Sequence, residues 1–248
     1  MKIFIFTGGN APLPNDYFTW LKNNGKIKNP RIITADSGID ILTEYNDFSR
    51  LSGNSLFYFV PNYLLGDMDS FKLKSVVEKL KENNFTAFTQ YPKDKDFSDT
   101  ELALRTAFEI KEYDQDSQVI LVGGTGGRTD HLISIFDSFS TKYHADVWLG
   151  EKEAVYYLKK NTEYTISGLN KDSCVSVARL SSSRRRGQIV TDGLFWEGKC
   201  YQKKGMISLS NRISDENLRL QKPVKIESKG SAVLLFLPFY AIVSPVKN

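Results

Sequence analysis

The first 150 residues alternate short apolar runs with longer stretches of helical periodicity. The runs are rich in Ile, Val and Phe, and they predict strands over residues 3–7, 31–35, 55–60, 85–89, 118–122 and 145–149. Residues 70–83 and 98–112 place apolar side chains on one face and polar ones on the other, as amphipathic helices do. Strands that alternate with helices favour a mainly parallel sheet flanked by helices.

From about residue 151 the pattern changes to short, often alternating apolar segments separated by Gly, Asn, Lys and Ser. They predict strands over residues 154–158, 163–166, 175–180, 188–190, 206–209, 224–227 and 232–236. Closely spaced strands of this kind are typical of an antiparallel sandwich or barrel. We therefore predict two domains, an α/β domain over residues 1–150 and an all-β, sandwich-like domain over residues 151–248.

The composition is that of an ordinary globular protein. The chain has 248 residues, of which 41% are hydrophobic and 25% charged, and this excludes collagen-like, disulfide-framework and disordered classes. Only Cys174 and Cys200 carry thiols, which favours a reducing compartment. No apolar run approaches the roughly 18 to 20 residues of a membrane span. The sequence thus predicts a cytoplasmic protein that does not insert into a membrane.

The charge is unevenly distributed between the halves. Residues 1–150 hold 16 basic and 20 acidic side chains, whereas the rest of the chain holds 17 and 9. Such asymmetry can indicate a basic nucleic-acid face. Apart from residues 184–186 the excess is thinly spread, so we interpret it as a solvated surface and predict no nucleic-acid partner. The segment 181–187 is predicted as an exposed hairpin loop, with a polyanion patch as the alternative.

Aspartates gather at the ends of the predicted strands. They are Asp36, then Asp67 and Asp69, then Asp94, Asp96 and Asp99, and finally Asp130. Two carboxylates about 4 Å apart repel by roughly 4 kcal/mol at an effective dielectric near 20, so a group of them requires protons or a cation. Mg²⁺ prefers oxygen ligands and commonly lies between carboxylates and substrate phosphates. A site for metal and phosphate is the favoured interpretation.

The alternative is that each aspartate caps a helix. Asp and Ser are favoured N-caps, and Ser98 with Glu101 fits the capping-box spacing. Capping needs one polar side chain per helix, however, and the loops at 67–69 and 94–99 carry two or three acids. The clusters therefore favour a site for metal and phosphate over helix capping alone.

A glycine-rich turn follows the predicted strand 118–122. Four of the five residues 123–127 are glycines, which lets the backbone approach a ligand closely, and a predicted helix at 132–140 follows Thr129. The N–H groups at the start of a helix attract phosphate, and Arg128 adds a planar, bidentate donor. The segment is not a Walker A loop, since that motif requires Lys at position 128.

Polar and aromatic residues also stand out in the second half. The aromatic ring of Trp196 is suited to stack on a flat, cationic ring of a ligand. The hydroxyls of Ser208 and Ser210 are suited to hydrogen-bond the polar edge of such a ring. From the residues alone, Trp196 is first interpreted as a core aromatic and residues 208–211 as a strand end.

Taken in order, these motifs resemble the thiamin pyrophosphokinase family. The resemblance rests on residues 35–38, 66–70, 94–99 and 124–131, and more loosely on 193–196 and 208–211, which together span nearly the whole chain. It departs from the family pattern at Ser37, where Gly is frequent, and at Ser98, where Thr is frequent. The segment 181–187 and the part after Asn211 match poorly.

The resemblance implies an α/β domain and a β-sandwich domain in a homodimer with active sites at the subunit interface. It implies transfer of the pyrophosphoryl group of ATP to the hydroxyethyl oxygen of thiamin, with Mg²⁺ as cofactor. The implied metal-binding residues are Asp67, Asp69 and Asp99. The implied catalytic residues are Asp69, Asp99 and Arg128. The implied ATP-binding residues are Asp36, Asp94, Asp96, Ser98, Gly127, Arg128, Asp130 and His131. The implied thiamin-binding residues are Trp196, Ser208, Ser210 and Asn211.

Two other functions use the same motifs. A Mg²⁺-dependent phosphohydrolase would employ the acidic loops with water as the acceptor. A non-enzymatic regulator would bind nucleotide or thiamin without consuming ATP. Formation of AMP only in the presence of thiamin separates the expected transferase from both.

Overall fold

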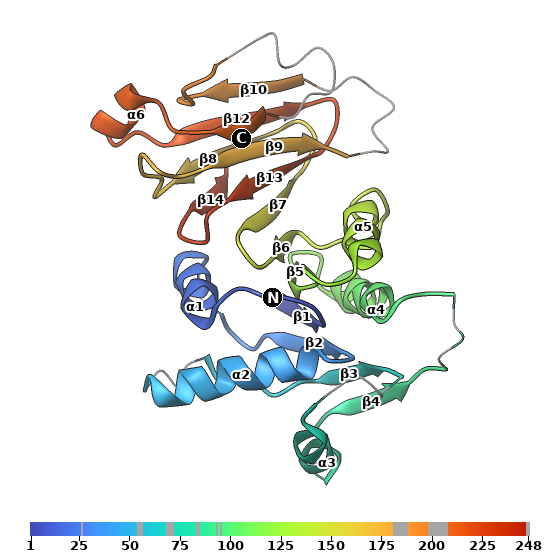
Figure 1. Ribbon diagram of the computed structural model, residues 1–248. Coiled ribbons are helices and arrows are strands. Elements are labelled where there is room, and N and C mark those ends of the chain that lie inside the picture. Colours follow the sequence, from blue (N-terminus) through green and yellow to red (C-terminus); the bar gives the residue numbers. More distant parts are fainter. Residues whose placement is uncertain are drawn as a thin grey trace. The chain divides into compact units, whose positions relative to one another are not determined.

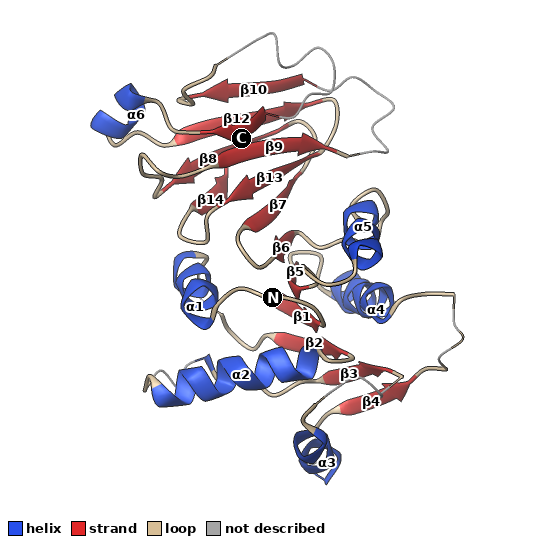
Figure 2. Ribbon diagram, viewed as in Figure 1, coloured by secondary structure: helices blue, strands red, loops and turns tan. Residues whose placement is uncertain are grey.

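A computed structural model describes most of the chain (Figures 1 and 2). The described residues are 1–25, 27–53, 57–67, 72–82, 85–92, 94, 96–180, 188–197 and 208–246. Asp69, Cys200 and the predicted loop 181–187 lie outside them. The chain divides into two compact units. The first comprises Met1–Pro14 and Ile27–Glu151, and the second comprises Asn15–Lys26 and Lys152–Asn248.

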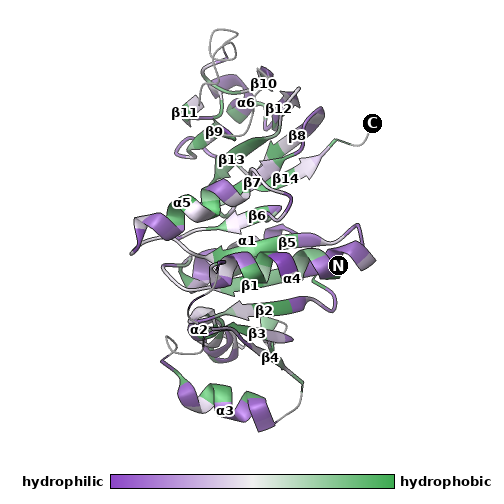
Figure 3. Cartoon of the chain, turned by 90° about the vertical axis from the view of Figure 1, so that its right-hand side faces the viewer, coloured by the Kyte–Doolittle hydropathy of each residue, from purple (hydrophilic) through white to green (hydrophobic). Residues whose placement is uncertain are grey.

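The first unit is built on parallel strands in the order β6-β5-β1-β2-β3-β4. Their bounds are β1 Lys2–Thr7, β2 Arg31–Ala35, β3 Tyr63–Gly66, β4 Ala87–Gln90, β5 Gln118–Gly123 and β6 Val147–Leu149. The central strands β1 and β5 are apolar runs, coloured green for hydrophobic residues in Figure 3, and they are buried on both faces. This confirms the predicted parallel sheet.

The strand order reverses beside β1, because β2 follows on one side and β5 lies on the other. The helices of this unit are α2 Gly38–Leu51, α3 Lys74–Glu82, α4 Asp99–Tyr113 and α5 Thr129–Ser138. Figure 1 shows α2 on one side of the sheet and α4 and α5 on the other. In such sheets a crevice forms outside the carboxyl ends of the strands where the order reverses, and ligands bind there.

Helix α2 packs closely on β1 through Gly38. A Cβ atom at this position would collide with the carbonyl oxygen of Phe6. Overpacking of a buried site costs about 1–3 kcal/mol. We expect Gly38→Ala to lower the free energy of unfolding by that amount, measured by urea denaturation. Glu44→Ala on the same helix, where the side chain is exposed, is the control and stays near wild type. Equal stability of the two variants would contradict this packing.

One predicted strand of the first unit is wrong. The described part of residues 55–60 is not a strand, and β3 lies instead at Tyr63–Gly66, where Leu64 and Leu65 are buried. The earlier apolar run is a connection whose Phe59 ring packs 6.0 Å from that of Phe4, while Tyr58 and Val60 are exposed. The helix predicted at 70–83 is described only from Lys74, and α5 begins at Thr129, three residues before its predicted start.

The second unit contains two sets of antiparallel strands, as predicted. One has the order β11-β9-β13-β7 and the other β10-β12-β8-β14. Their bounds are β7 Ala154–Leu158, β8 Thr162–Ser167, β9 Val175–Arg179, β10 Gln188–Asp192, β11 Ser208–Asn211, β12 Val224–Lys229, β13 Val233–Leu237 and β14 Ile242–Pro245. Alternate side chains of β12 are buried, which explains its alternating sequence. Strand β14 and the short helix α6 Asp215–Arg219 were not predicted.

Helix α1, Pro14–Asn23, belongs to the second unit although it precedes β2 in the sequence. Its Trp20 is fully buried and donates from Nε1 to the Tyr156 hydroxyl at 2.9 Å. The Asn23 amide donates to the carbonyl oxygen of Tyr240 at 3.0 Å. Within the described part of the chain, no helix is both long and apolar enough to span a membrane.

Candidate active site

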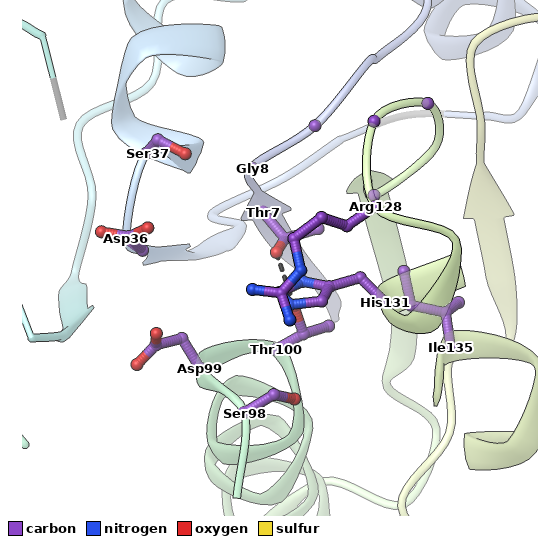
Figure 4. Close-up of a pocket in the computed structure, with 14 residues that line it drawn as sticks. Thr7, Gly8, Asp36, Ser37, Ser98, Asp99, Thr100, Arg128, His131 and Ile135 are labelled. Atoms are coloured by element: carbon purple, nitrogen blue, oxygen red, sulfur yellow. Dashed lines mark hydrogen bonds between the residues drawn. The ribbon is translucent and has the colours of Figure 1, made fainter. Parts of the chain in front are cut away.

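A cavity of about 340 Å³ lies in the first unit, at the carboxyl ends of its strands (Figure 4). Four separate segments line it: the end of β1, the turn from β2 to α2, the start of α4, and the glycine-rich turn at residues 123–127, here called the glycine loop, with the start of α5. The lining residues are Thr7, Gly8, Gly9, Asp36, Ser37, Ser98, Asp99, Thr100, Gly124, Gly126, Gly127, Arg128, His131 and Ile135. The cavity is thus located where the strand order reverses.

The turn after β2 carries Asp36 into this cavity. Asp36 has a left-handed backbone with φ of 48°, and its N–H donates to the carbonyl oxygen of Leu65 at 2.8 Å. A non-glycine residue in this region costs of order 1–3 kcal/mol, and such residues are concentrated at functional sites. The N-cap of α2, Ser37, makes no side-chain capping bond. Capping therefore does not explain Ser37 at this position.

The start of α4 provides the second carboxylate. Ser98 and Glu101 form the predicted capping box: the Glu101 N–H donates to Ser98 Oγ at 3.3 Å, and the Ser98 N–H donates to Glu101 Oε2 at 2.9 Å. Ser98 Oγ also lies 2.9 Å from Glu101 Oε2. Because Ser98 is the cap, the carboxylate of Asp99 is not needed for that role, and it lines the cavity beside Ser98 (Figure 4).

The glycine loop forms the wall opposite Asp36. Residues with L side chains rarely adopt the φ values of its four glycines. These values are 95°, 80°, 69° and 66° for Gly123, Gly124, Gly126 and Gly127. A Cβ at Gly124 would also collide with the Ile135 side chain. The segment after β1 holds the loop: the Asn10 N–H donates to the carbonyl oxygen of Thr125 at 2.5 Å, and the Asn10 amide donates to Glu151 Oε2 at 2.8 Å. The backbone thus stays open to a ligand in the cavity.

Arg128 projects over the cavity from the end of this loop (Figure 4). Its Nε donates to Asp130 Oδ1 at 3.2 Å and its Nη2 to Asp130 Oδ2 at 2.5 Å. This hydrogen-bonded guanidinium lowers the pKa of the Asp130 carboxyl to about 2, and Asp130 raises the pKa of Arg128. The depressed pKa means that the ion pair persists until the pH falls through about 2. Two of the three guanidinium nitrogens bond Asp130, and among the described residues Nη1 has no hydrogen-bond partner, so it can donate to a ligand.

The predicted residues of the metal and ATP site fall into three groups. Those that line the cavity are Asp36, Ser98, Asp99, Gly127, Arg128 and His131. The residues that the structure describes but that do not line this cavity are Asp67, Asp94, Asp96 and Asp130. Asp130 lines a second cavity between α4 and α5, and it accepts a hydrogen bond from Arg128, which lines the first. Asp69 lies outside the described residues.

The described part of the chain contains no group of three or more His, Cys, Asp or Glu residues placed to hold a metal ion. Asp36 and Asp99 nevertheless line one cavity together with serine and threonine hydroxyls. This set of oxygen donors fits Mg²⁺, which is commonly bound by one or two carboxylates and completes its shell with water and substrate phosphate.

Several lining residues were not predicted from the sequence: Thr7, Gly8, Gly9, Thr100 and Ile135. A signal was present for the glycines, because Gly8 and Gly9 follow the first predicted strand just as the glycine loop follows β5. No signal was available for Thr7, since it reads as the last residue of a buried strand.

The predicted thiamin-binding residues lie together in the second unit. Trp196 is 51% exposed, which corrects its interpretation as a core aromatic. Asn211 is buried, and its amide accepts from the Trp196 N–H at 3.2 Å and donates to the carbonyl oxygen of Trp196 at 3.1 Å and to Ser208 Oγ at 3.2 Å. Ser210 has a left-handed backbone, and its N–H donates to Ser176 Oγ at 3.0 Å. Asn211 therefore joins the indole segment to the serine segment.

Together, fold and cavity define an α/β protein with an acidic, glycine-rich cavity at the carboxyl ends of parallel strands, joined to an all-β unit. Residues 26–149 match the family model of the thiamin pyrophosphokinase catalytic domain. Since this match spans half of the chain, the protein belongs to the thiamin pyrophosphokinase family.

Solved structures agree with the fold. The thiamin pyrophosphokinase from Candida albicans is 15% identical, with a TM-score of 0.66 over 96% of this chain and 88% of that one. The thiamin pyrophosphokinase family protein from Enterococcus faecalis is 15% identical, with a TM-score of 0.67 over 96% and 99%. The thiamine pyrophosphokinase from Bacillus subtilis is 16% identical, with a TM-score of 0.66 over 96% and 99%. No curated protein sequence matches the chain.

Proposed function

We propose that this protein transfers the pyrophosphoryl group of ATP to the hydroxyethyl oxygen of thiamin, giving thiamin diphosphate and AMP. The family membership supports this reaction. The main structural support is the cavity, where two carboxylates, a glycine loop and Arg128 from separate segments lie together. A triphosphate with a hard cation matches that combination of acidic side chains, open backbone and guanidinium.

In this mechanism the protein mainly positions groups and balances charge. Asp36 and Asp99 would hold Mg²⁺, which neutralises charge on the phosphate oxygens. The open glycine backbone and the helix start approach the phosphates, and Nη1 of Arg128 donates to one of their oxygens. Attack at the β-phosphorus requires the thiamin hydroxyl to lie in line with the leaving AMP. Asp69 or Asp99 orients that hydroxyl or accepts its proton.

The second unit would supply the thiamin subsite. The exposed indole of Trp196 suits stacking on the cationic thiazolium ring, and Ser208 and Ser210 offer small polar groups. Asn211 contributes by holding Trp196 and Ser208 together, because its amide is already bonded within the protein.

Trp196→Ala therefore raises the KM for thiamin by about 5- to 30-fold, the range of a cation–π contact, and leaves the KM for ATP unchanged. Steady-state kinetics with each substrate varied in turn measures both values. Tyr113→Ala, which removes another exposed aromatic from the first unit, is the control and keeps both values. An unchanged KM for thiamin in the Trp196 variant would remove this residue from the subsite.

The homodimer and the cytoplasmic location stay predictions. Sedimentation velocity at micromolar protein measures the first: we expect the mass of two chains, and a single-chain mass would contradict it.

The reaction is tested by incubating protein, Mg²⁺ and ATP with and without thiamin, and separating the products. We expect equal amounts of AMP and thiamin diphosphate, formed only when both substrates are present. AMP or ADP formed without thiamin would support a phosphohydrolase. Binding of ATP or thiamin in calorimetry without consumption of ATP would support a regulator.

A further inference from the structure

Two threonine hydroxyls meet at the floor of the cavity. Thr7 Oγ1, at the carboxyl end of β1, lies 2.6 Å from Thr100 Oγ1 in the first turn of α4. Both residues line the cavity, and Thr7 is only 5% exposed, whereas Thr100 is half-buried. Figure 4 shows this hydrogen bond as a dashed line to the right of Asp99.

The pair holds one more proton than it uses. Each hydroxyl carries one hydrogen and also accepts, so the shared bond consumes one of the two protons. In the part of the chain that the structure describes, neither hydroxyl makes another hydrogen bond. Either hydroxyl can be the donor in this bond. Donation by Thr7 is the favoured arrangement, because it uses the proton of the more deeply buried hydroxyl, which would otherwise have no acceptor. The proton of Thr100 is then available to the cavity.

The surroundings indicate which acceptor this proton meets. The cavity wall consists of the open glycine backbone and the guanidinium of Arg128, which favour anions, and of Asp36 and Asp99, which favour a cation. A negatively charged phosphoryl oxygen bound to a metal ion suits both the groups that favour anions and the carboxylates that favour a cation. A neutral hydroxyl donor adds a hydrogen bond there without adding charge.

We propose that the Thr7–Thr100 pair binds phosphate: Thr7 donates to Thr100, and Thr100 donates to a phosphoryl oxygen of the nucleotide. The proposal rests on the proposed function in so far as the cavity takes a phosphate chain. Thr100 is the binding residue, and Thr7 is a positioning residue that orients it. The same bond ties the start of α4, and with it Asp99, to the end of β1.

The test is calorimetric titration of Mg²⁺-ATP, and separately of inorganic tripolyphosphate, into the full chain and its variants. Thr100→Val keeps the shape and removes the hydroxyl, and we expect both ligands to bind about 10- to 100-fold more weakly, as for loss of a hydrogen bond to a charged group. Thr7→Val gives a smaller loss, and Thr100→Ser restores binding to within about threefold of wild type.

Thr106→Val is the matched control, because Thr106 lies on the same helix and donates its hydroxyl to the carbonyl oxygen of Leu102 at 3.1 Å. It keeps wild-type affinity. In steady-state kinetics, Thr100→Val raises the KM for ATP and leaves the KM for thiamin unchanged. A merely structural role would move the melting temperature and both constants together.

The proposal is overturned if Thr100→Val binds both phosphates like wild type, or if Thr100→Ser is as weak as Thr100→Val. It is also overturned if the wild-type chain binds neither phosphate. Wild-type turnover without the expected ranking of affinities removes this proposal and leaves the proposed function standing. If the affinities show the expected ranking but no thiamin diphosphate forms, the phosphate-binding role of the pair stands and the proposed transfer to thiamin is contradicted.

Discussion

Asp99→Asn is expected to lower kcat about a thousandfold while leaving the fold intact. The substitution removes one of the two described carboxylates of the cavity and keeps its shape. A unit charge about 4 Å from a counter-charge contributes about 4 kcal/mol at an effective dielectric of 20, which corresponds to about three orders of magnitude in rate. Initial rates of AMP formation at saturating ATP, Mg²⁺ and thiamin measure the effect.

The fold should survive because the capping box of α4 uses Ser98 and Glu101. Loss of one acidic group from the first turn of a helix costs only about 0.3–1 kcal/mol. Glu109→Gln, on the same helix but exposed, removes the same charge and serves as the control, with a rate near wild type. Near-normal turnover by Asp99→Asn would remove this carboxylate from the reaction, and a collapsed melting temperature would assign it to folding instead.

Arg128→Lys is expected to reduce kcat/KM for ATP by about 100-fold although the charge is kept. Loss of one positioned donor to a developing anion typically costs about 100- to 1,000-fold in rate. The guanidinium bonds Asp130 through Nε and Nη2 and so presents Nη1 in a fixed direction. A lysine ammonium is a point charge that cannot bond Asp130 and a phosphate with the same geometry.

Arg50→Lys is the matched control, because Arg50 is an exposed arginine paired with an aspartate, Asp47, at 3.1 Å on α2. It keeps wild-type kinetics. Equal activity of Arg128→Lys and wild type would show that charge alone suffices there, and a loss confined to the KM for thiamin would place Arg128 at the other substrate.

The framework of the fold could be predicted because its signals are local. Buried parallel strands such as β1 and β5 are continuous apolar runs, and β12 alternates because one face is buried. The run at 55–60 misled the prediction because one buried ring, Phe59 on Phe4, gives a connection the appearance of a strand. Helix α1 packs in the second unit through Trp20 and Tyr156, a contact between residues 136 positions apart that no local pattern reveals.

The site was partly predictable for the same reason. Asp36, Asp99 and Arg128 follow strands or lie at the starts of helices. Because the carboxyl ends of parallel strands meet at one edge of the sheet, these residues were expected to lie together, and they do. Asp130 has the same sequence signal, yet its side chain bonds Arg128 and lines the second cavity. Thr7 and Thr100 meet only because α4 packs on β1, and their pairing depends on tertiary structure rather than on any motif.

The most direct measurement follows the γ-phosphorus of ATP. The protein is incubated with Mg²⁺, thiamin and ATP labelled at that phosphorus, and the products are separated. The proposed reaction places the label in the terminal phosphate of thiamin diphosphate and leaves AMP unlabelled. Label released as inorganic phosphate or pyrophosphate, with no labelled thiamin product, would contradict the proposed transfer.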